Sequence, residues 1–264
     1  MLIVCNGIFK SGSTWLHAIV LEILKIKEVR VSKIDKKYTN NVKSPTPIIE
    51  SKFEEFLRNE DYKNRTFVNK SHFFQVSTLN KNYNESVVFL FSERDLKDSI
   101  VSHYFHVKKK YNYISSFSIY YWTIGRLKAY EIVRFNQMYR NYFNDDNFIH
   151  YSTLINNFSS AVQKIANLIG FSSLSKEEIN NLKENTSLSN MRNKILIGDS
   201  NYYSTVTKGR EDLIRTGKER EYLTFFSLKK IQDINKIEKL NTSICFKFLY
   251  YFAFTLRRKI LQIE

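Results

Sequence analysis

Gly7-Ile8-Phe9-Lys10-Ser11-Gly12-Ser13-Thr14-Trp15 lies between a short apolar run at 2–5 and an amphipathic run that begins at Thr14. A strand, a glycine-containing loop and a helix in this order favour phosphate binding, because N–H groups of the loop and of the helix N-terminus point at one anion. The spacing Gly7-x-x-x-x-Gly12 followed by Thr14 has the frame of a P-loop. Ser13, however, stands where the loop of an ATPase or kinase has its lysine, and Lys10 stands inside the loop instead. We therefore expect a phosphate loop with its cation in an unusual place; an ordinary strand-to-helix turn is the alternative.

The rest of the chain alternates predicted strands with predicted helices. Apolar runs predict strands at 2–5, 65–70, 87–91 and 148–151. Apolar residues at helical spacing predict helices at 14–27, 51–59, 95–109, 116–143, 159–169, 175–185 and 227–240. This order predicts an α/β fold of the three-layer α/β/α type, with a central parallel sheet and with ligands at the carboxyl ends of its strands.

The chain shows no obvious domain boundary. No stretch rich in Gly, Ser or Pro divides it, so we expect a single domain over residues 1–264. Residues 30–50 are polar and hold both prolines, which predicts a loop region. Residues 186–226 have little periodicity and many polar groups, which is typical of a lid or binding loop.

The composition favours an anionic partner. Lys and Arg number 41 against 26 Asp and Glu, a formal net charge of +15. Such a balance suits nucleotides, sulfated or phosphorylated molecules, nucleic acid or a membrane surface, although lysine-rich surfaces are often only solvated. The two cysteines, Cys5 and Cys245, indicate neither a disulfide framework nor a zinc site. The chain begins almost directly with a core strand, so we expect no signal peptide and a cytoplasmic location.

His72 follows the end of the second predicted strand, in Lys70-Ser71-His72. An imidazole there can reach the cleft where the loop opens, and its ordinary pKa suits a general base for a hydroxyl or an amine. A lone histidine is more often structural, and Lys70 could simply be solvated. The other histidines lie within predicted helices or a strand, and we expect them to be structural: His17, His103, His106 and His150.

Arg94 follows the third predicted strand and precedes a helix. Its planar guanidinium can contact two phosphate oxygens at once, so it is a fair anion ligand. The alternative is a surface arginine paired with Asp95 or Asp98, both of which are well placed to cap the helix that follows. Taken alone, Ser102 is an ordinary helical serine.

These segments resemble, in the same order, motifs of the cytosolic-type sulfotransferases, whose sulfuryl donor is 3′-phosphoadenosine-5′-phosphosulfate (PAPS). Lys10-Ser11-Gly12-Ser13-Thr14-Trp15 resembles their 5′-phosphosulfate loop, and Lys70-Ser71-His72 resembles their Lys-Thr-His motif. Arg94 and Ser102 have the eight-residue spacing of the motif that binds the 3′-phosphate. The resemblance implies the P-loop-like sulfotransferase fold, PAPS as cofactor and adenosine 3′,5′-bisphosphate (PAP) as product.

Later segments resemble the same family more weakly. Tyr151, at the end of the fourth predicted strand, matches a tyrosine that contacts the nucleotide. Thr186-Ser187-Leu188 resembles the segment that meets the adenine, with Leu188 where the family usually has phenylalanine. Arg215-Thr216-Gly217 resembles the Arg-Lys-Gly that closes on the 3′-phosphate, with the middle lysine lost. Phe226-Ser227 fits the family's usual Phe-Thr, so the matches run from residue 7 to residue 227, most of the chain.

The resemblance also implies catalytic roles. His72 takes the acceptor's proton, Lys10 stabilises charge on the leaving phosphate, and Lys70 steadies charge on the sulfuryl group. The loop N–H groups, with Ser11, Ser13 and Thr14, hold the 5′-phosphate. No metal ion is expected, because a phosphosulfate carries less charge than a triphosphate.

Two other functions remain open. A P-loop nucleotide kinase shares the loop frame, but Ser13 replaces its lysine and Ser92, not aspartate, follows the strand at 87–91. A basic membrane- or nucleic-acid-binding protein would use the net charge and the apolar run at 244–260, which ends in Arg257-Arg258-Lys259. That run is too short to span a bilayer and fits either an interfacial helix or a core helix with a basic end.

The acceptor is not determined by the sequence. We expect a small molecule with a hydroxyl or an amine, and no nucleic-acid partner. The aromatic residues of 116–143, with Trp122 among them, fit either the lining of an apolar pocket or ordinary core. No dimerisation signature is evident, so the oligomeric state stays undetermined.

Overall fold

The computed structural model describes residues 1–39, 48–59, 62, 64–79, 86–196 and 217–261. The chain packs as two compact units. The first unit comprises Met1–Arg94 and Tyr142–Gly217, and the second comprises Asp95–Asn141 and Lys218–Glu264. Each unit is described by itself, and the single domain expected from the sequence stays a prediction.

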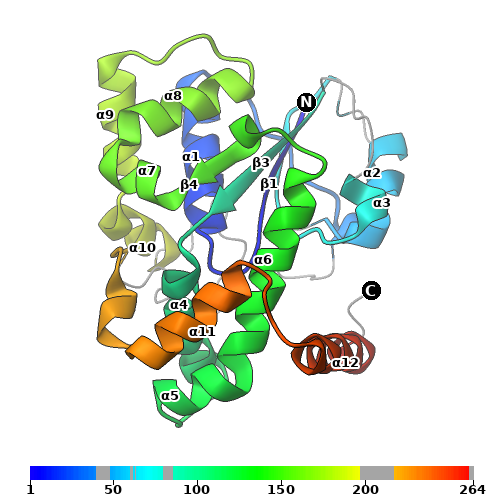
Figure 1. Ribbon diagram of the computed structural model, residues 1–264. Coiled ribbons are helices and arrows are strands. Elements are labelled where there is room, and N and C mark those ends of the chain that lie inside the picture. The colour runs from blue at the N-terminus through cyan, green and yellow to red at the C-terminus, as the bar shows by residue number, and fades with distance from the viewer. Residues whose placement is uncertain (40–47, 60–61, 63, 80–85, 197–216, 262–264) are drawn as a thin grey trace. The chain divides into compact units, whose positions relative to one another are not determined.

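The first unit is built on a parallel sheet (Figure 1). Its strands are β1 (Leu2–Gly7), β2 (Phe67–Lys70), β3 (Val87–Glu93) and β4 (Phe148–His150), in the order β2-β1-β3-β4. Cys5 of β1 pairs with Lys70 of β2 on one side and with Leu90 of β3 on the other. The chain leaves β1 for β2 and then crosses to β3, so the strand order reverses between β1 and β3. Ligands of such sheets bind at this point, beyond the carboxyl ends of the strands.

One face of the sheet is aliphatic and is covered by helices α1 (Ser13–Ile26) and α8 (Phe158–Leu168), with α7 (Tyr151–Asn156) and α9 (Lys176–Asn185) beside them (Figure 1). Alternate residues of each strand point to this face because side chains in a strand have a period of two. The sheet residues buried here are Ile3, Cys5, Val68, Leu90 and Ile149. Their burial gives α1 its fixed position behind the loop at 8–12.

The opposite face of the sheet is aromatic. α2 (Phe53–Asn59) follows the 3-10 turn η2 (Glu50–Lys52) and packs Phe53 on Phe89 of β3, with 6.1 Å between ring centroids. Phe56 meets Phe67 of β2 edge to face at 5.3 Å. The short helix α3 (Val76–Leu79) lies beside α2 (Figure 1). The predicted parallel sheet with helices on both faces is therefore confirmed.

The second unit is helical. It contains α4 (Leu96–Lys110), α5 (Phe117–Tyr120), the π-helical segment η3 (Tyr121–Gly125), α6 (Arg126–Arg140), the 3-10 turn η6 (Glu221–Thr224), α11 (Leu228–Glu238) and α12 (Ile244–Leu261). Arg126 of α6 forms a two-pronged ion pair with Asp233 of α11, with both N–O distances 2.8 Å. The sequence left open whether the aromatic residues of 116–143 line a pocket or form core. Several of them form the core of this unit, since Tyr120, Tyr121 and Tyr139 are fully buried.

Several short elements differ from the sequence prediction. Residues 188–196, predicted as part of an irregular lid, form helix α10 (Leu188–Leu196), whereas 197–216 lie outside the described residues. Tyr151 opens α7 and does not end a strand. The 3-10 turns η1 (Lys36–Tyr38) and η4 (Asp145–Asn147) were also not predicted. Elements of three to nine residues are too short to display a clear period in the sequence.

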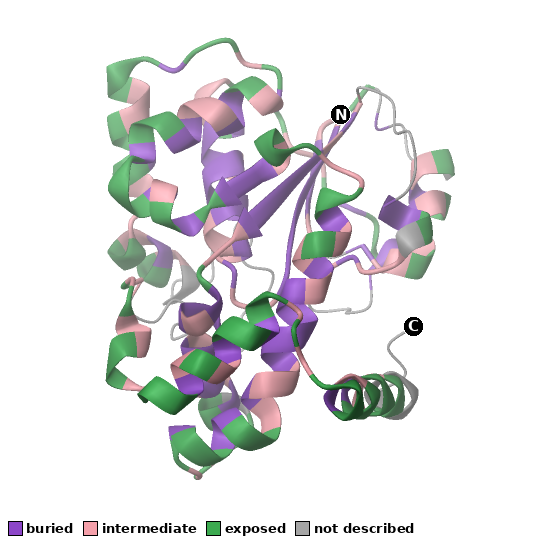
Figure 2. Ribbon diagram, in the orientation of Figure 1, coloured by how far each residue is buried: buried purple, intermediate pink, exposed green. Residues whose placement is uncertain are grey.

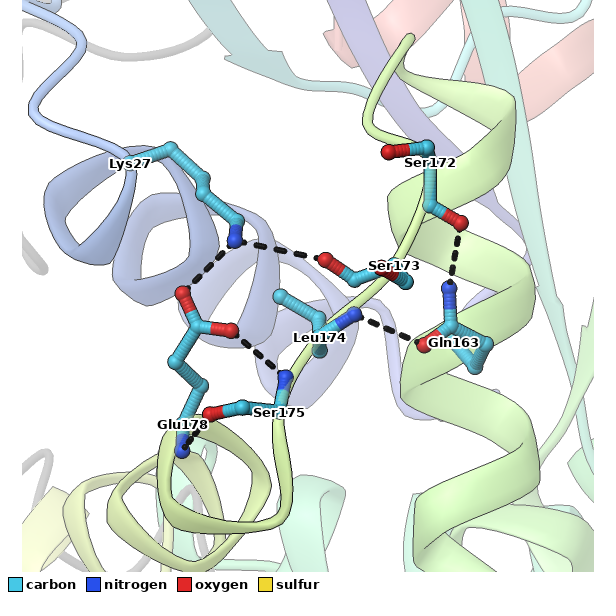
Figure 3. A network of polar contacts seen from close by, with 7 residues as sticks. All are labelled: Lys27, Gln163, Ser172, Ser173, Leu174, Ser175 and Glu178. Atoms are coloured by element: carbon cyan, nitrogen blue, oxygen red, sulfur yellow. Dashed lines mark hydrogen bonds and ion pairs between the residues drawn. The ribbon is translucent and has the colours of Figure 1, made fainter.

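A polar network fixes the connection between α8 and α9 to the end of α1 (Figure 3). Lys27 donates to Glu178 at 2.6 Å and to the Ser173 carbonyl at 3.3 Å. Ser175 and Glu178 form a capping box at the start of α9. The hydrogen bond from Lys27 holds the pKa of Glu178 below its ordinary value. The contribution of this carboxylate to stability is therefore present at neutral pH and is lost as the pH falls through the lowered pKa.

We expect Ser175→Ala to lower the free energy of unfolding by about 1 kcal/mol, because the Glu178 N–H loses its acceptor. Urea unfolding measures the change. Ser172→Ala is the matched control, since the network uses only the carbonyl of Ser172. Equal stability of the two variants would show that the capping box contributes nothing.

Candidate active site

The loop between β1 and α1 is shaped by left-handed backbone. Lys10 has φ 66° and Gly12 has φ 101°, and Gly12 is the N-cap residue of α1. No side chain caps this N-terminus, and no acidic residue lies in the first turn. An uncapped first turn presents N–H groups and the positive end of the helix dipole, so this end of α1 is suited to an anion.

Ser11 and Ser92 hold the loop against the end of β3. The Ser11 hydroxyl donates to the Ile8 carbonyl, and the hydroxyls of Ser11 and Ser92 lie 2.7 Å apart. A Cβ at Gly7 would lie 2.5 Å from Ser92 Oγ, so glycine is needed there. The sequence indicated only that Ser92 stands where a kinase has an aspartate. It did not indicate that Ser92 packs against Gly7 and Ser11. The Ser11 hydroxyl is occupied inside the loop, and its contact with a phosphate stays a prediction.

His72 is anchored on the loop by its ring. Its Nδ1 faces the carbonyl oxygen of Gly7, and its ring centroid lies 5.0 Å from that of Phe9. Because a carbonyl oxygen only accepts, Nδ1 carries the proton in the neutral ring and Nε2 carries the lone pair. This is the tautomer that a general base needs.

Asn6 positions the segment that carries His72, and the sequence analysis missed it. Asn6 is fully buried near the end of β1. Its Oδ1 accepts the Phe73 N–H at 2.9 Å and the Ser71 hydroxyl at 3.2 Å. The signal was a polar residue within an otherwise apolar buried strand, since such a group must find partners.

Lys70 joins the end of β2 to the first turn of α1. Its Nζ donates to Thr14 Oγ1 at 2.6 Å. Lys70 and Thr14, which were assigned to the site separately, therefore lie next to each other beside the loop. A cation at this place adds to the positive potential at the helix N-terminus.

Tyr151 packs against several of the other predicted site residues. The Arg94 guanidinium carbon lies 4.5 Å from the centre of its ring, and the Trp15 ring meets it edge on at 5.4 Å. Its hydroxyl donates to the Gly217 carbonyl at 3.4 Å. A Cβ at Gly12 would lie 2.7 Å from Tyr151 Cδ2. The ring therefore brings the loop, the end of β3 and Gly217 together.

The remaining predicted site residues lie in different parts of the structure. Leu188 joins the Tyr151 cluster, since a Cβ at Gly217 would lie 2.6 Å from Leu188 Cδ1. The buried Thr186 hydroxyl donates to the Leu182 carbonyl and closes the end of α9. Ser102 lies in α4 of the second unit, and Arg215 and Thr216 lie outside the described residues.

The other histidines have structural surroundings. Burial lowers the pKa of His17 to about 3, so this ring stays neutral. His103 Nδ1 lies 2.5 Å from the Tyr120 hydroxyl, and His150 Nδ1 lies 3.2 Å from Glu93. In the parts of the chain that the structure describes, no group of three or more His, Cys, Asp or Glu side chains could hold a metal ion.

Asp98 has a different role from the one predicted. The helix cap is Asp95 alone, whose carboxylate accepts the Asp98 N–H at 3.0 Å. The buried Asp98 carboxylate accepts the N–H groups of Arg220 and Tyr222, at 2.8 and 3.1 Å. Asp98 thus fixes the turn around η6 to α4. The two bonds join residues more than 120 positions apart, which no local pattern in the sequence could indicate.

The family model described as "Sulfotransferase domain" matches residues 2–244. Among curated proteins, none matches the chain in sequence. Solved structures with the same fold include mouse sulfotransferase SULT7A1 complexed with PAP, with a TM-score of 0.61 and 19% identity. That match covers 97% of this chain and 88% of the other.

Retinol dehydratase has a similar fold in two further structures. One is its complex with retinol and PAP, and the other is its complex with androsterone and inactive cofactor PAP. Both match with a TM-score of 0.62 and 20% identity, covering 91% of this chain and 80% of the other. At this level of identity the likeness bears on the fold alone.

We expect Gly12→Ala to destabilise the protein more than Gly170→Ala. Both glycines have positive φ, 101° and 91°, so both substitutions carry a backbone strain of about 1–2 kcal/mol. At Gly170 a Cβ meets nothing within 4 Å, whereas at Gly12 it collides with the Tyr151 ring. The clash adds about 1–3 kcal/mol. Urea unfolding compares the stability of the two variants, and near-ultraviolet circular dichroism follows the packing of Trp15 on Tyr151. Equal losses of stability together with unchanged spectra would contradict the packing role of Tyr151.

Proposed function

Because the chain belongs to the sulfotransferase family, we propose that it transfers a sulfuryl group from PAPS to a hydroxyl or an amine of a small-molecule acceptor. The observation that carries the proposal is the uncapped N-terminus of α1, with Lys10 inside its loop and His72 anchored beside it. Similar structures hold PAP, and two of them hold retinol or androsterone, which supports a nucleotide donor and a small acceptor. The family expected from the sequence is confirmed.

The residues of the loop fit a phosphate group. The first turn of α1 has neither a side-chain cap nor an acidic residue, so no side chain occupies its N-terminus and no carboxylate there repels an anion. Gly12 keeps the backbone open at this point, next to Tyr151. When bound, PAPS would supply an activated sulfuryl group attached to a 5′-phosphate.

We assign the loop and its neighbours to the 5′ end of that molecule. The backbone N–H groups of the first turn, with the hydroxyls of Ser13 and Thr14, hold the phosphate. Lys10 stabilises the charge that grows on the leaving phosphate oxygen, as fixed cations do in related group transfers. Lys70, bonded to Thr14, keeps a second positive charge beside the sulfuryl group.

His72 is the general base of the proposed reaction. Its Nδ1–H is held by the Gly7 carbonyl, and Asn6 holds the residues on either side of it, so Nε2 is oriented before the acceptor binds. Nε2 takes the proton of the acceptor hydroxyl or amine as its oxygen or nitrogen attacks the sulfur. Fixed orientation of the base lowers the entropic cost of the in-line transfer.

The nucleotide end of the donor is assigned from the sequence motifs. Arg94 and Ser102 bind the 3′-phosphate, closed by Arg215, Thr216 and Gly217. The adenosine is contacted by Trp15, Tyr151, Thr186 and Leu188. The cluster around Tyr151 supports this assignment, because Arg94, Trp15, Leu188 and Gly217 converge there.

A nucleotide kinase is the second candidate, on the P-loop frame alone. Two observations speak against it: Ser13 stands in place of the kinase lysine, and Ser92, not an acid, follows the apolar run 87–91 of β3 and lies 2.7 Å from the Ser11 hydroxyl. We also propose that turnover needs no metal ion and is unchanged by EDTA. The cytoplasmic location stays a prediction.

We expect PAP to raise the unfolding temperature and ATP with magnesium to leave it unchanged. At a ligand concentration of 100 times Kd the stabilisation is about 2.7 kcal/mol. Thermal shift measures both ligands side by side. A response only to ATP with magnesium would favour the kinase, and no response to either would mean that the fold lacks its donor site.

We expect His72→Ala to reduce turnover by about 10²–10⁴-fold with PAP binding intact, because only the base is lost. Lys10→Ala should reduce turnover by a similar factor through lost charge stabilisation of the leaving group. His150→Ala is the control, since this half-exposed ring pairs with Glu93. Near-normal turnover of His72→Ala would remove the base from the mechanism.

A further inference from the structure

The C-terminal helix α12 is attached to the second unit by one narrow face. Phe246 and Tyr250 are buried there and contact the Tyr130 ring of α6, at 5.6 and 4.7 Å between centroids. The Arg126 guanidinium carbon lies 4.7 Å from the centre of the Phe246 ring. These contacts pack one side of α12 against α6 and leave the other side of the helix exposed.

The uncovered side of α12 is apolar. Phe248 is 74% exposed and Phe252 is 61% exposed. In Figure 2 the helix is coloured mostly as exposed. At about 100° per residue, the exposed apolar side chains fall within one sector of roughly 160°. They are Ile244, Cys245, Phe248, Leu249, Tyr251, Phe252 and Leu256. This is the pattern of an amphipathic helix turned outwards, and the sequence expectation of a core helix holds for its attached face alone.

The charged residues of the α12 segment all have one sign. The segment Ile244–Leu261 contains Lys247, Arg257, Arg258 and Lys259 and no acidic residue. The second unit as a whole has 18 Lys and Arg residues against eight Asp and Glu residues. The surface that covers α12 must therefore be both apolar and negatively charged.

We propose that α12 docks the protein on an anionic lipid bilayer, lying in the plane of its surface. The exposed aromatic and aliphatic side chains enter the boundary between headgroups and acyl chains, and the basic residues meet lipid phosphates. Among the described residues no helix is long and apolar enough to cross a membrane, which agrees with a helix that lies on the surface.

Two observations favour lipid over a second copy of this chain. Pairing of α12 with itself would bring the basic residues of both copies together without an acidic residue between them, which costs free energy. The match to the family model ends at residue 244, where α12 begins, so the sequence pattern that defines the family does not include the exposed side chains of α12. A lipid surface supplies both the apolar depth and the negative charge.

Co-sedimentation of the full chain with vesicles tests the proposal. We expect binding to vesicles of phosphatidylcholine mixed with phosphatidylglycerol, weak binding to phosphatidylcholine alone, and a decrease of binding in high salt. A tryptophan introduced by Phe252→Trp should shift its emission to the blue with the anionic vesicles. The readout does not use turnover, so failure of the proposed reaction would leave this result unaffected.

The double variant Phe248→Ser/Phe252→Ser should lose at least about tenfold in vesicle binding, because two exposed rings no longer enter the bilayer. Its unfolding curve should match that of the native chain, since neither ring is buried. Ile114→Ser/Leu228→Ser removes two side chains that are 94% and 70% exposed in the same unit and serves as the control, with binding unchanged.

Three results would overturn the proposal. The first is equal vesicle binding of the native chain and the Phe248→Ser/Phe252→Ser variant. The second is that the native chain binds neither kind of vesicle. The third is a dimer that forms without lipid in sedimentation equilibrium and that the same variant abolishes. The last result would assign the face to a second copy of the chain.

Discussion

The packing of the Tyr151 ring on Gly12 is the constraint on which the rest of the site depends. The ring occupies the space that a Cβ would need, and Gly12 keeps a left-handed backbone that only glycine adopts at little cost. The same ring lies under Arg94 and beside Trp15, and its hydroxyl reaches Gly217. One aromatic side chain therefore sets both the turn before α1 and the positions of the groups assigned to the nucleotide.

A second set of buried polar bonds holds the opposite side of the loop. Asn6, Ser11 and Ser92 are all buried. Asn6 accepts from the Phe73 N–H, and Ser11 bonds to both the Ile8 carbonyl and the Ser92 hydroxyl. Such bonds are weak in net free energy but costly to leave unmade, so they specify one arrangement of the loop and of the His72 segment. The loop and the His72 segment are thus held in place by bonds within the fold, independently of a ligand.

The second unit uses polar bonds in the same way but ends differently. Asp98 fixes a turn through two backbone N–H groups, and Arg126 with Asp233 joins α6 to α11. α12 then departs from the rule that apolar side chains turn inwards, since its larger apolar face is exposed. A contiguous exposed apolar patch of this kind marks an interaction surface, and burial within the unit cannot explain it.

The parallel α/β fold, the loop before α1 and the family could be predicted from the sequence, because these rest on local signals: continuous apolar runs, helical spacing and glycines at fixed distances. The sequence also named Lys70, His72, Arg94 and Tyr151, which lie at or just after the carboxyl ends of strands and so along one edge of the parallel sheet. Only the tertiary structure decided the roles of Asn6, Ser92 and Asp98, because their partners lie far away in the chain, and it alone showed that α10 is helical. It also decided which side of α12 is buried, since an apolar helical run looks the same in sequence whether a core or a solvent-exposed surface receives it.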